Sequence, residues 1–134
     1  MRPLFEILDG IPAWEAVAAR HGLSAWVADE LAAAGRAVPP PLQAAARAQV
    51  AQGLKVKRLT LTVLDALASA GIVAVPLKGY GLATRLFPQQ PLARPSVDVD
   101  VFVEPAAIET AAAALRKLGL TAHGVPGVAD VEEE

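Results

Sequence analysis

The chain of 134 residues contains no cysteine. This absence excludes disulfide bonds, zinc sites built from thiolates and cysteine nucleophiles, and it agrees with a reducing cytoplasm. Aromatic residues are also scarce, at 4% of the chain. No uninterrupted apolar run reaches the roughly 18 residues of a transmembrane helix, and the short apolar run at the N-terminus does not resemble a signal peptide. We therefore expect a cytoplasmic protein with no membrane partner.

An excess of positive charge is missing as well. Lysine and arginine together number 12 and aspartate and glutamate 14, which gives a formal net charge of −2 at pH 7. We therefore expect no basic surface for a phosphate backbone, and composition does not indicate a nucleic-acid partner. The chain is rich in apolar residues, with 54% hydrophobic and 19% charged. That is enough apolar material for a sizeable core in one domain.

The first segment, residues 1–38, has apolar residues at helical spacing and glycines that end two predicted helices. Ser24 is a suitable N-cap for the second of these helices. Trp14 and Trp26 are expected to anchor the core, since large aromatic side chains dominate burial. The segment therefore predicts a helical layer at the N-terminus.

The second segment, residues 39–71, predicts one long helix. Three consecutive prolines fix the backbone before a helical pattern that runs from Leu42 to Ala70. Apolar side chains at helical spacing form the stripe that we expect to be buried: Val50, Leu54, Leu61, Leu64 and Ala68, widened by Val63 and Leu67.

The third segment, residues 72–123, changes to the spacing of β-strands. Residues 72–77 predict a strand that leads into a turn at Lys78 and Gly79 and then a short helix. A glycine turn before a helix N-terminus presents backbone N–H groups and the positive end of the helix dipole to an anion. Lys78 adds a full positive charge at this position. A third strand is predicted to begin at residues 120–123, before a loose tail at 124–134.

Two carboxylates interrupt a second valine-rich strand, predicted over residues 96–103. Because side chains alternate along a strand, Asp98 and Asp100 project from one face, about 7 Å apart. The neighbouring valines project from the other face and can be buried: Val97, Val99 and Val101. The two carboxylates repel each other unless a cation lies between them, and a hard divalent ion with oxygen ligands suits that position. In the alternative interpretation, Asp98 is solvated, caps backbone N–H groups or pairs with Arg94.

These motifs, in this order, resemble a family of uncharacterised nucleotidyltransferases. The resemblance rests on Leu77-Lys78-Gly79, then Arg94, then Asp98-Val99-Asp100, with Ala19-Arg20-His21-Gly22 similar to a signature in the family's N-terminal helix. It covers roughly residues 12–120. It implies the polymerase-β-like nucleotidyltransferase fold, of the α/β (α+β) class, with a small mixed sheet of two or three strands and a helical N-terminal layer.

The resemblance also implies transfer of a nucleoside monophosphate from an NTP to an unknown acceptor. Asp98 and Asp100 would be the catalytic, metal-binding pair, with Mg²⁺, or Mn²⁺ in its place, as the cofactor. Lys78 and Gly79 take the position of the phosphate-binding turn, where many relatives of the fold have Gly-Ser. For Arg94 two roles stay open: holding a phosphate or bracing the loop.

In this fold a third carboxylate completes the metal site, and the resemblance places it after the point where this chain ends. The late acids of the chain are Asp130, Glu132, Glu133 and Glu134, and no pattern places them on a strand beside Asp98. The chain could be a truncated enzyme, a core completed by a partner chain, or a non-catalytic binding or regulatory module. Missing cover would leave apolar surface exposed, so we expect self-association or a partner chain on the helix Leu42–Ala70.

Overall fold

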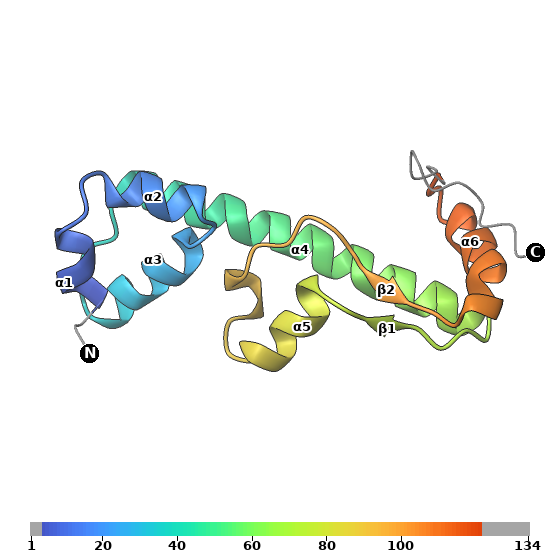
Figure 1. Ribbon diagram of the computed structural model, residues 1–134. Helices are drawn as coiled ribbons and strands as arrows, with labels where there is room; N and C mark the ends of the chain where they lie inside the picture. The colour runs from blue at the N-terminus through green and yellow to red at the C-terminus, as the bar shows by residue number, and fades with distance from the viewer. Residues whose placement is uncertain (1–3, 122–134) are drawn as a thin grey trace, which may run out of the picture.

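A computed structural model describes residues 4–121 of the chain. Within that range, six α-helices and a two-stranded antiparallel sheet are arranged along one long helix, α4 (Pro40–Ser69) (Figure 1). The predicted α/β class is confirmed, with helices predominant and a sheet of two strands. None of the helices in residues 4–121 combines the length and hydropathy needed to cross a membrane.

Helix α4 has 30 residues, which corresponds to a length of about 45 Å. Two prolines occupy its first turn, where their missing N–H groups would have no partner within the helix. The predicted buried stripe is wrong in part, because Leu54 and Leu61 are 50% and 47% exposed. The face that is buried instead includes small and polar residues: Leu42, Ala46, Gly53, Val56, Thr60, Val63 and Leu67.

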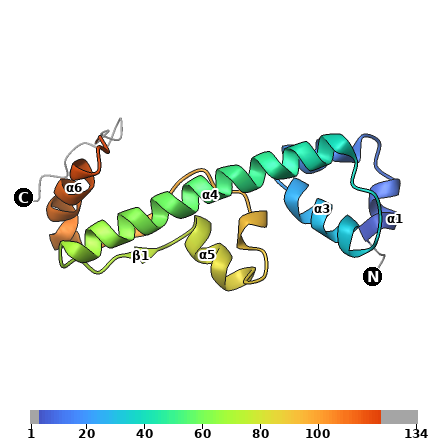
Figure 2. The ribbon, with the colours of Figure 1, turned by 180° about the vertical axis from the view of Figure 1, so that it is seen from behind.

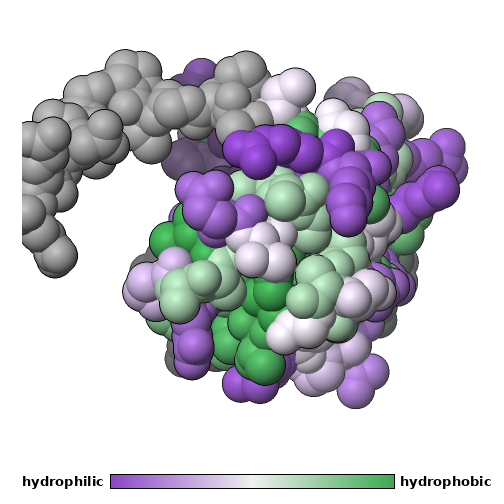
Figure 3. Space-filling view, turned by 90° about the vertical axis from the view of Figure 1, so that its right-hand side faces the viewer, coloured by the Kyte–Doolittle hydropathy of each residue, from purple (hydrophilic) through white to green (hydrophobic). Residues whose placement is uncertain are grey.

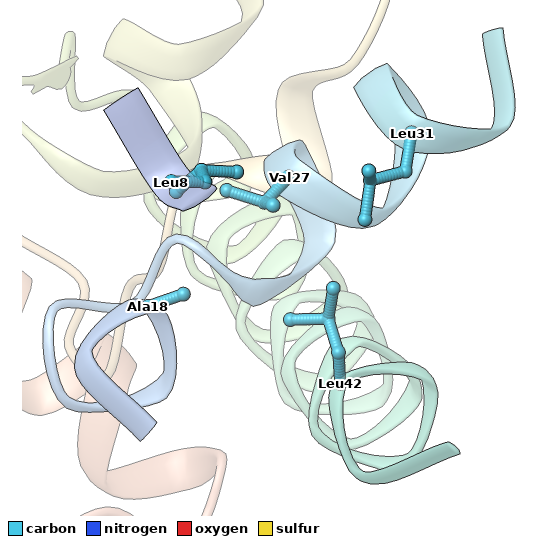
Figure 4. Close-up of a cluster of buried hydrophobic side chains, with 5 residues drawn as sticks. All are labelled: Leu8, Ala18, Val27, Leu31 and Leu42. Atoms are coloured by element: carbon cyan, nitrogen blue, oxygen red, sulfur yellow. The ribbon is translucent and has the colours of Figure 1, made fainter. Parts of the chain in front are cut away.

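Three short helices pack against the first turns of α4. They are α1 (Leu4–Asp9), α2 (Trp14–Arg20) and α3 (Ser24–Ala33). Their buried side chains, together with Leu42 of α4, form the N-terminal cluster drawn in Figure 4: Leu8, Ala18, Val27, Leu31 and Leu42. Trp14 packs at the edge of this cluster, but Trp26 is 38% exposed, so only one of the two predicted anchors reaches the core. Ser24 begins α3 one residue earlier than predicted and does not cap it.

The other end of α4 carries a second, separate cluster. Strands β1 (Val75–Pro76) and β2 (Val101–Phe102) lie along α4, and α6 (Ile108–Lys117) crosses its end after a single turn, η2 (Pro105–Ala107) (Figures 1 and 2). The buried residues of this C-terminal cluster come from α4, the approach to β1 and α6: Val63, Leu67, Ile72 and Ala111. Both strands are shorter than predicted. Residues 120 and 121 form no third strand, and 122–123 lie outside the described residues.

The sheet is covered on one face only. Val101 and Val103 pack on the C-terminal cluster, as the alternation predicts, whereas Val97 is 81% exposed because β2 begins only at Val101. On the opposite face Val75 and Phe102 are paired across the sheet and are 51% and 56% exposed. Figure 3 views the molecule from the end that carries α6 and shows apolar residues gathered between polar ones.

Between the two clusters, α5 (Gly79–Leu86) and the short turn η1 (Pro91–Ala93) pack on the middle of α4 (Figure 1). Gln49 of α4 joins the elements here. Its Nε2 donates to the Ala93 carbonyl oxygen at 2.6 Å, and its Oε1 accepts from the Ala25 N–H at 3.3 Å. This one side chain therefore fixes η1 and α3 to the same turn of α4.

Candidate functional site

The turn between β1 and α5 is built around Gly79. Lys78 is extended, and Gly79 follows with φ +61°, a left-handed conformation that L-residues rarely adopt. A Cβ atom on Gly79 would lie 2.7 Å from the Ser96 Oγ and 3.2 Å from the Asp98 carbonyl oxygen. Glycine is therefore required both by the backbone angle and by the close approach of the Asp98 segment.

Asp98 and Asp100 lie in an extended segment just before β2. The predicted strand over residues 96–103 is reduced to β2, so the aspartates do not stand on a regular strand. The pairing continues by one residue beyond the sheet, since the Leu77 N–H donates to the Asp100 carbonyl oxygen at 3.0 Å. The Ser96 hydroxyl donates to the Asp98 carbonyl oxygen at 3.2 Å. Backbone contacts thus hold the segment against the Gly79 turn.

An ion pair joins the turn to the aspartates. Lys78 Nζ lies 3.0 Å from Asp100 Oδ2, and the two side chains are 64% and 33% exposed. The oxygen is shielded from solvent, and no other donor among the described residues reaches it. The contact with Asp100 raises the pKa of Lys78, and the charge of Asp98 raises it further. In this structure, therefore, the Lys78 ammonium is the cation beside the carboxylates.

Arg94 connects η1 to the same turn. Its Nη1 donates to the Gly79 carbonyl oxygen at 3.4 Å, a long hydrogen bond that agrees with the bracing role. Arg94, Lys78, Gly79 and Asp98 line one open cleft of about 250 Å³, together with Ser96 and its neighbours. The structure thus brings together all five residues singled out in the sequence, with Asp100 joined to the cleft through Lys78.

Residues 12–133 match the sequence profile of a family described as uncharacterised nucleotidyltransferases. The chain belongs to this nucleotidyltransferase family. The match covers most of the chain and confirms the resemblance that the motifs indicated. No curated protein and no solved structure matches the chain.

The oxygen donors of this nucleotidyltransferase family member suit a hard divalent ion, but there are few of them. Asp98 and Asp100 supply carboxylate oxygens, which Mg²⁺ and Mn²⁺ prefer. Among the described residues, Asp100 Oδ2 contacts only the ammonium of Lys78, which is carried on a flexible side chain. Within residues 4–121 no group of three or more potential metal-binding side chains comes together. The late acids from Asp130 onward lie outside the described residues. Two carboxylates alone would leave most ligand positions of such an ion to other groups.

Sequence reasoning missed the contact between Lys78 and Asp100. It treated Lys78 as a phosphate ligand and the aspartates as a separate metal pair. Spacing gave no signal for this contact, because an antiparallel pairing with Leu77 opposite Asp100 places Lys78 opposite Val99, on the other face from the second carboxylate.

Proposed function

We propose that this protein transfers a nucleoside monophosphate from an NTP to an acceptor hydroxyl, with a divalent ion at Asp98 and Asp100. One observation carries the proposal. Lys78 and Gly79 of the turn line the same cleft as Asp98, and the Lys78 ammonium contacts Asp100. Anion-binding and cation-binding groups side by side are what a nucleotide with its metal ion requires.

The turn supports binding of the phosphates. Helix α5 begins at Gly79, and Lys78 at its N-cap provides no side-chain hydrogen bond to the first-turn N–H groups. Those groups and the helix dipole favour an anion at this end. Lys78 directly precedes this helix, and its ammonium contacts Asp100. A triphosphate bound at the helix start would therefore compete with Asp100 for the ammonium.

The carboxylates support binding of the ion. Mg²⁺, or Mn²⁺ in its place, would be held by Asp98 and Asp100. When bound, it would neutralise phosphate charge and favour attack by the acceptor hydroxyl. Without the ion, Lys78 offsets the repulsion between the carboxylates. A third carboxylate from a partner chain would complete the site.

Calorimetric titration with Mg²⁺ and each of the four NTPs tests the proposal. We expect the wild type to bind one or more Mg-NTP complexes and Asp98→Asn to lose this binding. Asp65→Asn, at an exposed acid of α4, is the matched control and should bind like the wild type. A wild type that binds no Mg-NTP at millimolar concentrations would refute the proposal. Binding without pyrophosphate release in the presence of acceptors would favour the non-catalytic module.

We also propose that α4 associates with a second copy of the chain. Three leucines on it are between 41% and 50% exposed: Leu54, Leu59 and Leu61. Leu54 and Leu61 are two turns apart on the same side of α4, and exposed apolar side chains that are neighbours on a surface favour association. Sedimentation at increasing concentration tests this, and a monomer at all concentrations would contradict it.

A further inference from the structure

A second cleft adjoins the one at the Gly79 turn. It has a volume of about 200 Å³ and lies between the start of α3 and the chain that follows α5. Trp26 and Phe87 contribute its rings, Gln90 an amide, and Arg94 and Pro95 the boundary that it shares with the first cleft. We refer to it as the aromatic cleft.

The two rings of the aromatic cleft are unusually accessible. Trp26 is 38% exposed and Phe87 49% exposed, although large aromatic side chains contribute more to burial than any others. The chain has only six Phe, Trp and Tyr residues, and two of them line this one cleft. Aromatic faces open to solvent beside a few polar groups are the usual lining of a site for a planar ligand.

The walls of the aromatic cleft are fixed to each other. Gly22 has φ +67°, and a Cβ atom there would lie 2.5 Å from the Pro95 Cγ, so the two chain segments are in close contact. Gln49 holds η1 and α3 to α4 from behind. The cleft therefore exists before a ligand enters, which lowers the entropy cost of binding.

We propose that the aromatic cleft binds the nucleobase of the NTP whose phosphates lie at Lys78 and Gly79. This inference rests on the proposed function. The two clefts share Arg94 and Pro95 and therefore adjoin, and the NTP would extend past these two residues from the phosphate turn to the rings. Complete sites for drug-sized ligands have volumes of about 300–1,000 Å³, so a cleft of this size suits a single ring system. The base would stack on Trp26 or Phe87, within reach of the Gln90 amide.

Two measurements test the inference. In a Trp14→Phe background, Trp26 is the sole tryptophan, and its fluorescence reports a stacked base. Phe87→Leu removes one ring, and Phe102→Leu, at the exposed face of the sheet, is the matched control. Loss of one stacking ring should weaken NTP binding between about 5-fold and 150-fold. Magnesium tripolyphosphate, which has no base, should bind Phe87→Leu as it binds the wild type.

The expected result is that an NTP quenches Trp26, tripolyphosphate binds without quenching, and only Phe87→Leu weakens the NTP. If an NTP binds by calorimetry but leaves Trp26 and the Phe87→Leu affinity unchanged, the inference is overturned while the proposed function stands. If an NTP quenches Trp26 and tripolyphosphate does not bind, the aromatic cleft is supported and the phosphate turn is not. If neither compound binds, both proposals fail.

Discussion

Replacing Gly79 by alanine should lower the free energy of unfolding by about 1.5–2.5 kcal/mol. The left-handed backbone accounts for about 1–2 kcal/mol, because an L-residue at φ +61° brings its Cβ close to the following carbonyl. The new Cβ also lies 2.7 Å from the Ser96 Oγ, which must turn away and give up its hydrogen bond to Asp98. That loss adds about 0.5–1.5 kcal/mol, near the lower end because Ser96 is partly solvated.

Gly71 provides the matched control. It has φ +75°, but a Cβ there would meet no atom within 4 Å. Gly71→Ala should therefore cost only the backbone contribution of about 1–2 kcal/mol. The difference between the two variants measures the close approach of the Asp98 segment. Ser96→Ala removes the nearest atom but gives up the same hydrogen bond, so adding it to Gly79→Ala should cost little more than Gly79→Ala alone.

Urea denaturation measures these losses, and the slope with denaturant should stay unchanged if only stability is affected. The variants should also differ in function, because only Gly79→Ala displaces the segment that carries Asp98. Equal losses for Gly79→Ala and Gly71→Ala would refute the reasoning. Equal losses would mean that the turn shifts by a few tenths of an ångström with no further loss of stability.

Three further predictions concern the carboxylates and α4. Asp98→Asn should leave the melting temperature of the ligand-free protein unchanged, because its side chain is exposed, and should abolish any rise with Mg-NTP; a drop in the ligand-free melting temperature would instead indicate a structural role. The ion pair that raises the pKa of Lys78 contributes its full stability below the unfolded-chain pKa of 10.5. This contribution is lost as the pH rises through the pKa of Lys78 in the folded protein. The wild type should therefore lose stability at alkaline pH more steeply than Asp100→Asn, and parallel curves from thermal melts would contradict this. Leu61→Lys should shift any dimer seen in sedimentation towards monomer, whereas an unchanged dimer would place the interface elsewhere.

The parts of the fold that follow from local chemistry were predictable from the sequence. Prolines at the start of α4 restrict the backbone angle, and the glycine after Lys78 permits the left-handed one. The helix and the turn therefore lie where the residues indicated. The order of the turn, Arg94 and the aspartates also identified the family correctly. The catalytic and metal-binding roles assigned to these residues stay predictions.

What failed depends on distant contacts. The buried face of α4 was assigned to its largest side chains, yet Leu54 is exposed while Gly53 is buried, because Leu92 of η1 packs there at 3.3 Å from where a Cβ would be. Thr60 is buried because its hydroxyl donates to the Val56 carbonyl oxygen within the helix. Trp26 is exposed because the chain after α5 forms a cleft against it. The burial of Gly53 and the cleft beside Trp26 depend on neighbours from other elements, which spacing within one helix does not reveal.

The two apolar clusters at opposite ends of α4 share no residue. Because each end of α4 has its own buried cluster, one end can open without the other, so amide protons of its two halves should exchange with different opening free energies. The Gly79 turn follows β1, at the end of α4 that carries the C-terminal cluster, while Trp26 stands on α3, a helix of the N-terminal cluster. A nucleotide that contacts both would therefore link two cooperative units, and its binding would slow exchange at both ends of α4 together.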